Sequence, residues 1–169
     1  MSVSIEALEA RIARLEDVEA IRKLKARYLR ACDLKQIEAV RDSFLPGRVR
    51  IAYQGFDTFG DRDAFVDVYR EMACQGGVYD IHHAHNAEIE ITSADTATGL
   101  WSLDFRTILL ASSSVTRLAV EYSDIYRKRD GRWWIEESES RITSSLTEEI
   151  AKDGFARYLA WGATPPAPN

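Results

Sequence analysis

One acidic residue and one run of histidines carry most of the chemistry that this sequence offers. Asp33 stands at the end of the first long apolar-periodic stretch, and all three histidines of the chain lie in the segment Ile81-His82-His83-Ala84-His85. A carboxylate that accepts a hydrogen bond from one imidazole nitrogen fixes the tautomer, and the other nitrogen can then take a proton from a substrate carbon. A histidine-dependent mechanism must therefore use this segment.

The elements that position these residues follow from the periodicity of the apolar side chains. Apolar residues three and four apart from Ile5 to Leu24 predict an amphipathic helix that continues to Asp33. The remaining expected elements are a helix from Ile37 to Phe44, a strand with Val49, Ile51 and Tyr53, a helix capped by Asp61 that ends near Gly76-Gly77, four long antiparallel strands from Tyr79 to Thr143, and a final helix from Glu148 to Trp161. Helices followed by such strands predict an α+β fold, in which helices cover one face of a curved sheet around a pocket.

The phase of the histidine-containing strand decides which imidazole faces the interior. Simple alternation back from Glu88 puts His82 on the polar face and His83 and His85 on the apolar face. A β-bulge between Ala84 and Glu88 reverses this phase, and bulges are common beside active sites. We predict the bulge, with His82 inside. The alternative is that His83 or His85 faces the interior. These two histidines could also bind a metal ion together, but no third ligand stands at a recognisable spacing.

Several short motifs relate the chain to a known family. Over residues 15–143 the chain resembles the SnoaL-like branch of the NTF2-like superfamily, in Tyr28-x4-Asp33, Tyr53, Ile81-His82, the run from Ala94 to Trp101, and the run from Asp130 to Ile135. Within that branch it is most similar to bile-acid 7-alpha-dehydratase, and more distantly to scytalone dehydratase and hexachlorocyclohexane dehydrochlorinase. The resemblance implies an NTF2-like cone, with N-terminal helices wrapping a mixed, mostly antiparallel sheet around an internal pocket, and a lyase without cofactor or metal.

The resemblance also implies roles for individual residues. Asp33 and His82 match the family's Asp-His dyad, and Tyr28 matches a catalytic tyrosine of the bile-acid enzyme. The expected substrate-binding residues are Tyr53, Arg141 and Phe105, of which Phe105 stands where the bile-acid enzyme has a catalytic aspartate. The neighbouring Asp104 is expected on the other face of its strand.

Three of these residues also have a purely structural interpretation. Asp33 is suited to capping the next helix through a backbone N–H. Tyr28 continues the apolar stripe of its helix and is suited to core packing. Arg141 follows an acidic run, so a surface ion pair that contributes little to stability is the alternative to substrate binding.

The expected function is a dehydratase-type elimination of water, or of another small leaving group, from a small hydrophobic cyclic carbonyl compound. His82, oriented by Asp33, would abstract the proton next to the carbonyl. Two alternatives stay open. An isomerase or polyketide-type cyclase would keep the proton abstraction, and a small-ligand-binding module would use the fold without catalysis.

Composition limits the setting and the partners. A chain of 169 residues with 46% hydrophobic content fits one domain, and a net charge of -5 argues against a nucleic-acid partner. Two cysteines without CxxC spacing and no apolar run of bilayer length favour a cytoplasmic protein without a membrane partner. The heptad spacing from Ile5 to Leu15 predicts a homo-oligomer, and the resemblance implies a trimer. We expect an N-terminal helical extension at 1–14, the SnoaL/NTF2-like domain at 15–145, and a C-terminal helix and tail at 146–169.

Overall fold

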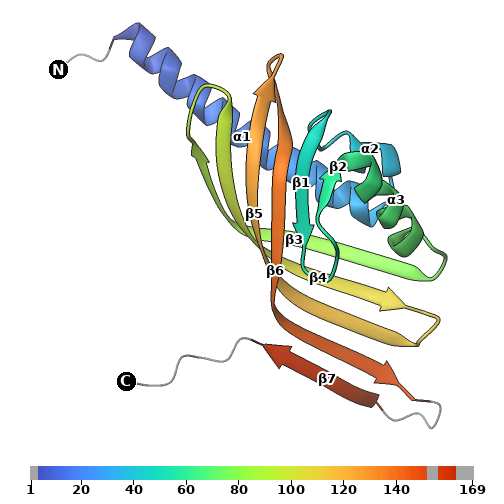
Figure 1. The fold of residues 1–169 in the computed structure, drawn as a ribbon. Helices are drawn as coiled ribbons and strands as arrows, with labels where there is room; N and C mark the ends of the chain where they lie inside the picture. The colour runs from blue at the N-terminus through green and yellow to red at the C-terminus, as the bar shows by residue number, and fades with distance from the viewer. Residues whose placement is uncertain (1–3, 152–155, 163–169) are drawn as a thin grey trace, which may run out of the picture.

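The computed structural model describes residues 4–151 and 156–162 and has an α+β architecture (Figure 1). Three helices accompany one long, strongly curved sheet. The elements follow one another as α1 (Ile5–Asp33), α2 (Ile37–Arg41), β1 (Arg48–Tyr53), β2 (Phe59–Asp61), α3 (Arg62–Ala73), β3 (Val78–Ile91), β4 (Thr96–Leu109), β5 (Ser114–Arg129), β6 (Arg132–Ile150) and β7 (Ala156–Gly162).

The sheet is mixed but mostly antiparallel, as the sequence predicted. Its strands lie in the order β2-β1-β6-β5-β4-β3, with β1 parallel to β6 and the other pairs antiparallel. Helix α1 packs along β3 and β6, and α3 packs against β1 and β2. This arrangement is the curved, helix-covered cone of the NTF2-like fold, and it leaves a cavity between the helices and the concave sheet.

Helix α1 consists of an exposed first half and a buried second half. Ser4 caps its start by accepting a hydrogen bond from the Ala7 backbone N–H. The apolar side chains from Ile5 to Leu15 are exposed, and this half projects past the sheet in Figure 1. Burial begins at Ile21. Self-association through the exposed half, and the trimer, stay predictions. No helix in the described ranges combines the length and apolar character needed to cross a membrane.

The predicted bulge in the histidine-containing strand is present. The pairing of β3 with β4 shifts between His85 and Glu88, where β3 contains one more residue than its partner. Asn86 within this shift has a left-handed φ of 49°. Before the bulge the inward residues have even numbers, and after it they have odd numbers, from Ala87 to Ile91. His82 therefore points to the inside of the sheet.

The C-terminal segment differs from the sequence-based expectation. Glu148 to Trp161 was predicted to be helical, but β6 runs on to Ile150 and residues 156–162 form β7, paired antiparallel with the second half of β6. That half of β6 extends past its pairing with β1, so its edge offers free backbone groups that a further strand satisfies. Tertiary pairing thus overrides the local helical pattern. Residues 152–155 and the tail from 163 lie outside the described ranges, and the division into three regions stays a prediction.

Gly99 on β4 is packed too closely for a side chain. A Cβ atom there would lie 2.9 Å from Cε2 of Tyr126 and 3.1 Å from Nε1 of Trp101, and both rings are buried. We expect Gly99→Ala to lower the free energy of unfolding by about 1–3 kcal/mol through overpacking. Urea denaturation measures this, with Gly60→Ala as control because nothing lies within 4 Å of a Cβ at Gly60. Equal stability of the two variants would contradict the prediction.

Candidate functional site

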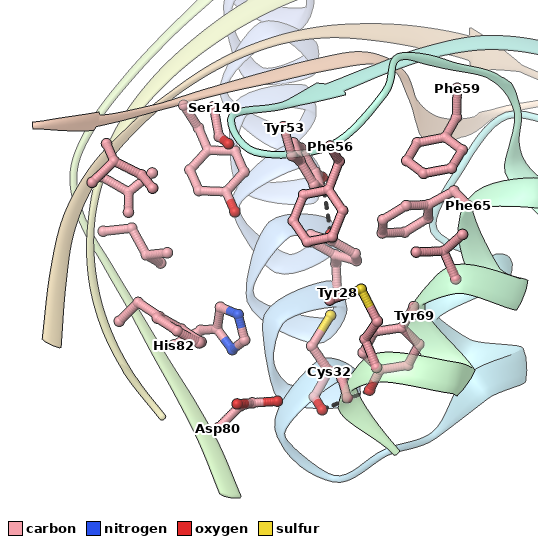
Figure 2. A pocket seen from close by; sticks show the side chains of 18 residues that line it. Tyr28, Cys32, Tyr53, Phe56, Phe59, Phe65, Tyr69, Asp80, His82 and Ser140 are labelled. Atoms are coloured by element: carbon pink, nitrogen blue, oxygen red, sulfur yellow. Dashed lines mark hydrogen bonds between the residues drawn. The ribbon is translucent and has the colours of Figure 1, made fainter. Parts of the chain in front are cut away.

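The cavity between α1, α3 and the concave face of the sheet is the candidate site (Figure 2). Its volume is about 200 Å³. Most of the wall is apolar and includes Phe56, Phe59, Phe65, Val68, Leu103 and Ile142. Such a cavity, lined by apolar groups with a few polar ones, is the usual form of a site for a small neutral ligand.

His82 projects into this cavity and is held from behind by Asp33. Nδ1 of His82 lies 2.6 Å from Oδ1 of Asp33, and Oδ2 of Asp33 accepts the His82 backbone N–H at 3.3 Å. Because the carboxylate accepts both bonds, Nδ1 carries a proton and the neutral ring keeps a lone pair on Nε2. The side chains are only 15% and 24% exposed. Asp33 does not cap the next helix, whose N-cap is Gln36. The contact that the family resemblance implied between the two residues is present, and their catalytic role stays a proposal.

Two phenols from different elements meet in the cavity wall. The hydroxyl oxygens of Tyr28, on α1, and Tyr53, on β1, are 2.9 Å apart (Figure 2). Burial raises the pKa of Tyr28 well above its usual value, and the neighbouring Tyr53 raises it further. Burial also raises the pKa of Tyr53. Both hydroxyls therefore stay protonated and neutral over the physiological pH range, which suits them to hydrogen bonding with a ligand.

Phe105 and Asp80 complete the surroundings of His82. Phe105 lines the cavity, with its ring centroid 4.7 Å from that of His82, as its expected substrate contact requires. Asp80 also lines the cavity and forms a salt bridge with Lys35. Asp80 was not expected from the sequence, although it stands two residues before His82 on the same strand and alternation places both on one face.

The other two histidines lie on the opposite face of β3. His83 and His85 are exposed, and Nε2 of His85 lies 3.4 Å from Oδ2 of Asp104. Asp104 is on the outer face of its strand, as predicted. Within the described ranges, no group of three or more His, Cys, Asp or Glu side chains is placed to hold a metal ion.

Arg141 does not line this cavity, so its expected role in substrate binding is wrong. Its guanidinium pairs with Glu121 on the neighbouring strand, and both side chains are more than half exposed. Arg141 faces Glu121 across the β5–β6 ladder, whereas Ser140 and Ile142 on either side of it line the cavity. Strand alternation therefore turns Arg141 outward, and the surface ion pair is the correct interpretation.

Cys32 contributes a buried thiol to the cavity wall. Burial raises the pKa of this thiol to about 12 from its usual value near 9. Since the native state favours the neutral thiol, its contribution to stability is complete below about pH 9 and is lost as the pH rises through about 12. We expect the free energy of unfolding to fall less between about pH 8 and pH 11 in Cys32→Ala than in the unmodified protein. Urea denaturation at both pH values measures this difference, and parallel pH profiles would contradict it.

Comparison with known proteins agrees with this architecture. A family model described as a SnoaL-like domain matches residues 13–139. The structure is similar to hexachlorocyclohexane dehydrochlorinase LinA-type3 from Novosphingobium barchaimii LL02, with a TM-score of 0.72, 20% identity, and coverage of 92% of this chain and 99% of that one.

Two proteins from Novosphingobium aromaticivorans are also similar in structure. A candidate scytalone dehydratase has a TM-score of 0.71 and 20% identity, with 78% of this chain and 87% of that chain covered. An NTF2-like protein with a cystatin-like fold has a TM-score of 0.69 and 23% identity, with 84% and 92% covered. At these identities the similarity supports the fold, and the resemblance to the bile-acid enzyme stays a prediction.

Proposed function

Because the chain belongs to the SnoaL-like family, we propose that it is a cofactor-independent lyase that eliminates water, or another small leaving group, from a small neutral ring compound bearing a carbonyl. The observation that carries this proposal is the contact of His82 with Asp33 at the wall of an apolar cavity. Two of its structural neighbours are named as a dehydrochlorinase and a candidate dehydratase, which favours elimination among the reactions that a positioned base can start.

The size and lining of the cavity limit the substrate. An apolar cavity of about 150 Å³ accommodates benzene, so a volume of about 200 Å³ suits a single ring with one or two small substituents. The carboxylate at the wall, Asp80, is paired with Lys35. The wall residues Val120 and Tyr122 add an aliphatic side chain and an aromatic ring. These features favour a neutral, largely apolar substrate.

In the proposed reaction, the proton that the base removes from carbon is returned to the leaving hydroxyl within the same site. Nε2 of His82 takes the proton from the carbon next to the carbonyl, and the electrons of that C–H bond form the C=C bond as the bond to the leaving hydroxyl breaks. Asp33 stabilises the resulting imidazolium by direct hydrogen bonding. The imidazolium gives this proton to the departing hydroxyl, which leaves as water. In a second route, a phenol donates its own proton to the hydroxyl and then takes the proton of the imidazolium.

A ring substrate with a hydroxyl in the β position tests the proposal directly. We expect β-hydroxycyclohexanone, incubated with the protein in deuterated water, to lose water and form a conjugated enone, which is detected by ultraviolet absorption and mass spectrometry. γ-Hydroxycyclohexanone is the control, because its hydroxyl is not β to the carbonyl. A panel of β-hydroxy ring ketones extends the test to other ring substituents.

The outcomes separate the competing functions. Deuterium incorporation beside the carbonyl without loss of water would favour an isomerase or cyclase. Binding of ring ketones without elimination or deuterium incorporation across the panel would favour a ligand-binding module. Either result would contradict the proposed lyase.

A further inference from the structure

A chain of buried hydroxyl groups links the cavity to an ion pair in the core. The hydroxyl of Tyr53, 2.9 Å from that of Tyr28, donates to Oγ of Ser138 at 3.2 Å. Oγ of Ser138 lies 2.7 Å from Oδ1 of Asp124, and Nζ of Lys25 lies 2.7 Å from Oδ2 of the same carboxylate. The side chains of Lys25 and Asp124 are fully buried. The cavity phenols are therefore continuous with a charged group that is shielded from water.

The direction of these hydrogen bonds is fixed at the carboxylate. The indole of Trp101 can only donate, and Nε1 lies 3.0 Å from the hydroxyl of Tyr126, so that hydroxyl directs its own proton to Oδ2 of Asp124 at 2.7 Å. The Lys25 ammonium also donates to Oδ2. A buried ammonium requires a charged partner, because leaving it unpaired is strongly unfavourable. Asp124 is therefore an ionised carboxylate that only accepts.

This direction extends along the chain to the cavity. Ser138 has one hydroxyl proton and gives it to Asp124, so it can only accept from Tyr53. Since the proton of Tyr53 points to Ser138, Tyr28 must donate to Tyr53. Neither phenol then has a proton left for a ligand, so both can only accept a hydrogen bond from a ligand in the cavity that they line. Nε2 of His82 also offers a lone pair, because the proton of that ring is on Nδ1.

We infer that the phenol pair, Tyr28 and Tyr53, is the subsite for a hydroxyl group of the substrate and not for its carbonyl, and that Ser138 is the positioning residue that sets this preference. The inference rests on this cavity being the substrate site of the proposed function, but not on His82 acting as a base. A β-hydroxy ring ketone would bind with its leaving hydroxyl against the phenols and its carbonyl directed elsewhere.

The direction of the chain can reverse by rotation of two hydroxyls. Tyr53 turns its proton from Ser138 to Tyr28, and Tyr28 then donates to the ligand oxygen. The reversal gives up one internal hydrogen bond, equivalent to roughly a three- to tenfold change in binding. It becomes favourable when negative charge develops on the departing oxygen. The same phenols thus accept from the bound hydroxyl and donate to it as it leaves.

Two unreactive single-ring probes test the inference. Cyclohexanol can donate a hydrogen bond to the phenols, whereas cyclohexanone can only accept, and their dissociation constants are measured by NMR titration. We expect the unmodified protein to bind cyclohexanol roughly three- to tenfold more tightly. In Ser138→Ala, the proton of Tyr53 is free to turn to Tyr28. The ratio of the cyclohexanone dissociation constant to the cyclohexanol dissociation constant should therefore fall to about one or below.

Matched variants separate this effect from a general loss of structure. Ser43→Ala removes another buried hydroxyl, which donates to the backbone of Ala39 and is not part of the phenol chain. This variant should keep the preference of the unmodified protein for cyclohexanol. Tyr53→Phe breaks the chain at another point and should also favour cyclohexanone, so it replaces Ser138→Ala if that variant does not fold.

Four outcomes would overturn the inference. These are a preference of the unmodified protein for cyclohexanone, equal affinities for the two probes, an unchanged ratio in both Ser138→Ala and Tyr53→Phe, or no binding of either probe. Loss of the elimination reaction with the probe preference intact would instead count against the proposed lyase alone.

Discussion

Replacing His82 with alanine is expected to lower the rate of elimination by about 100- to 10,000-fold, the contribution that a positioned general base makes. The expectation follows from the placement of Nε2 at the cavity wall, with Nδ1 bound to Asp33. Asp33→Asn should also reduce the rate, since the amide can present its N–H₂ group to Nδ1 and favour the wrong tautomer. Initial rates of enone formation from β-hydroxycyclohexanone measure both effects.

A histidine on the outer face of the same strand is the matched control. His85 is exposed and pairs with Asp104, so His85→Ala should keep the rate of the unmodified protein. Circular dichroism and thermal denaturation establish that each variant is folded. If His82→Ala keeps more than about a tenth of the rate, the loss is smaller than a positioned base supplies and the proposed role is wrong.

Replacing Lys25 with methionine is expected to lower the free energy of unfolding by about 3–5 kcal/mol, because it leaves the Asp124 carboxylate buried without its counter-ion. Both side chains are fully shielded from solvent. The ammonium also lies 4.0 Å from the ring centroid of Tyr122, and this cation–π contact is lost as well. Urea denaturation near neutral pH measures the change.

An exposed lysine on the same helix provides the control. Lys23 forms a surface pair with Glu19, with more than half of each side chain exposed, so Lys23→Met should change the stability by less than about 0.5 kcal/mol. A loss below about 1 kcal/mol in Lys25→Met would place the buried pair in the range of an exposed one and contradict the prediction.

The orientation of the histidine-containing strand shows how much the sequence could determine. Alternation alone puts His82 outside, and only a one-residue bulge brings it into the cavity. The bulge was predicted because the family resemblance requires His82 inside and bulges are common beside active sites. The pairing of His82 with Asp33 depended on the family resemblance, since residues 49 positions apart leave no local signal of contact.

The C-terminal strand, the outward orientation of Arg141 and the buried ion pair could not be predicted correctly from the local sequence pattern. The segment from Glu148 has a helical pattern, but the free edge of β6 recruits residues 156–162 as a strand, and such long-range pairing cannot be seen in a local window. Arg141 matched a family position, although alternation along β6 turns it outward. Lys25 did leave a signal, because it is a charged residue within the apolar stripe of α1. Its partner Asp124, on a distant strand, could not be identified from the sequence.

Helix α1 supplies Lys25 to the core, Tyr28 to the cavity and Asp33 to the imidazole. A small translation of α1 along its axis, or a small rotation about it, would displace all three polar groups together. Redesign of the site for a new substrate should therefore leave α1 unaltered. The wall that α3 contributes, with Phe65 and Val68, offers replaceable surfaces on which selectivity can be changed while the reacting groups keep their alignment.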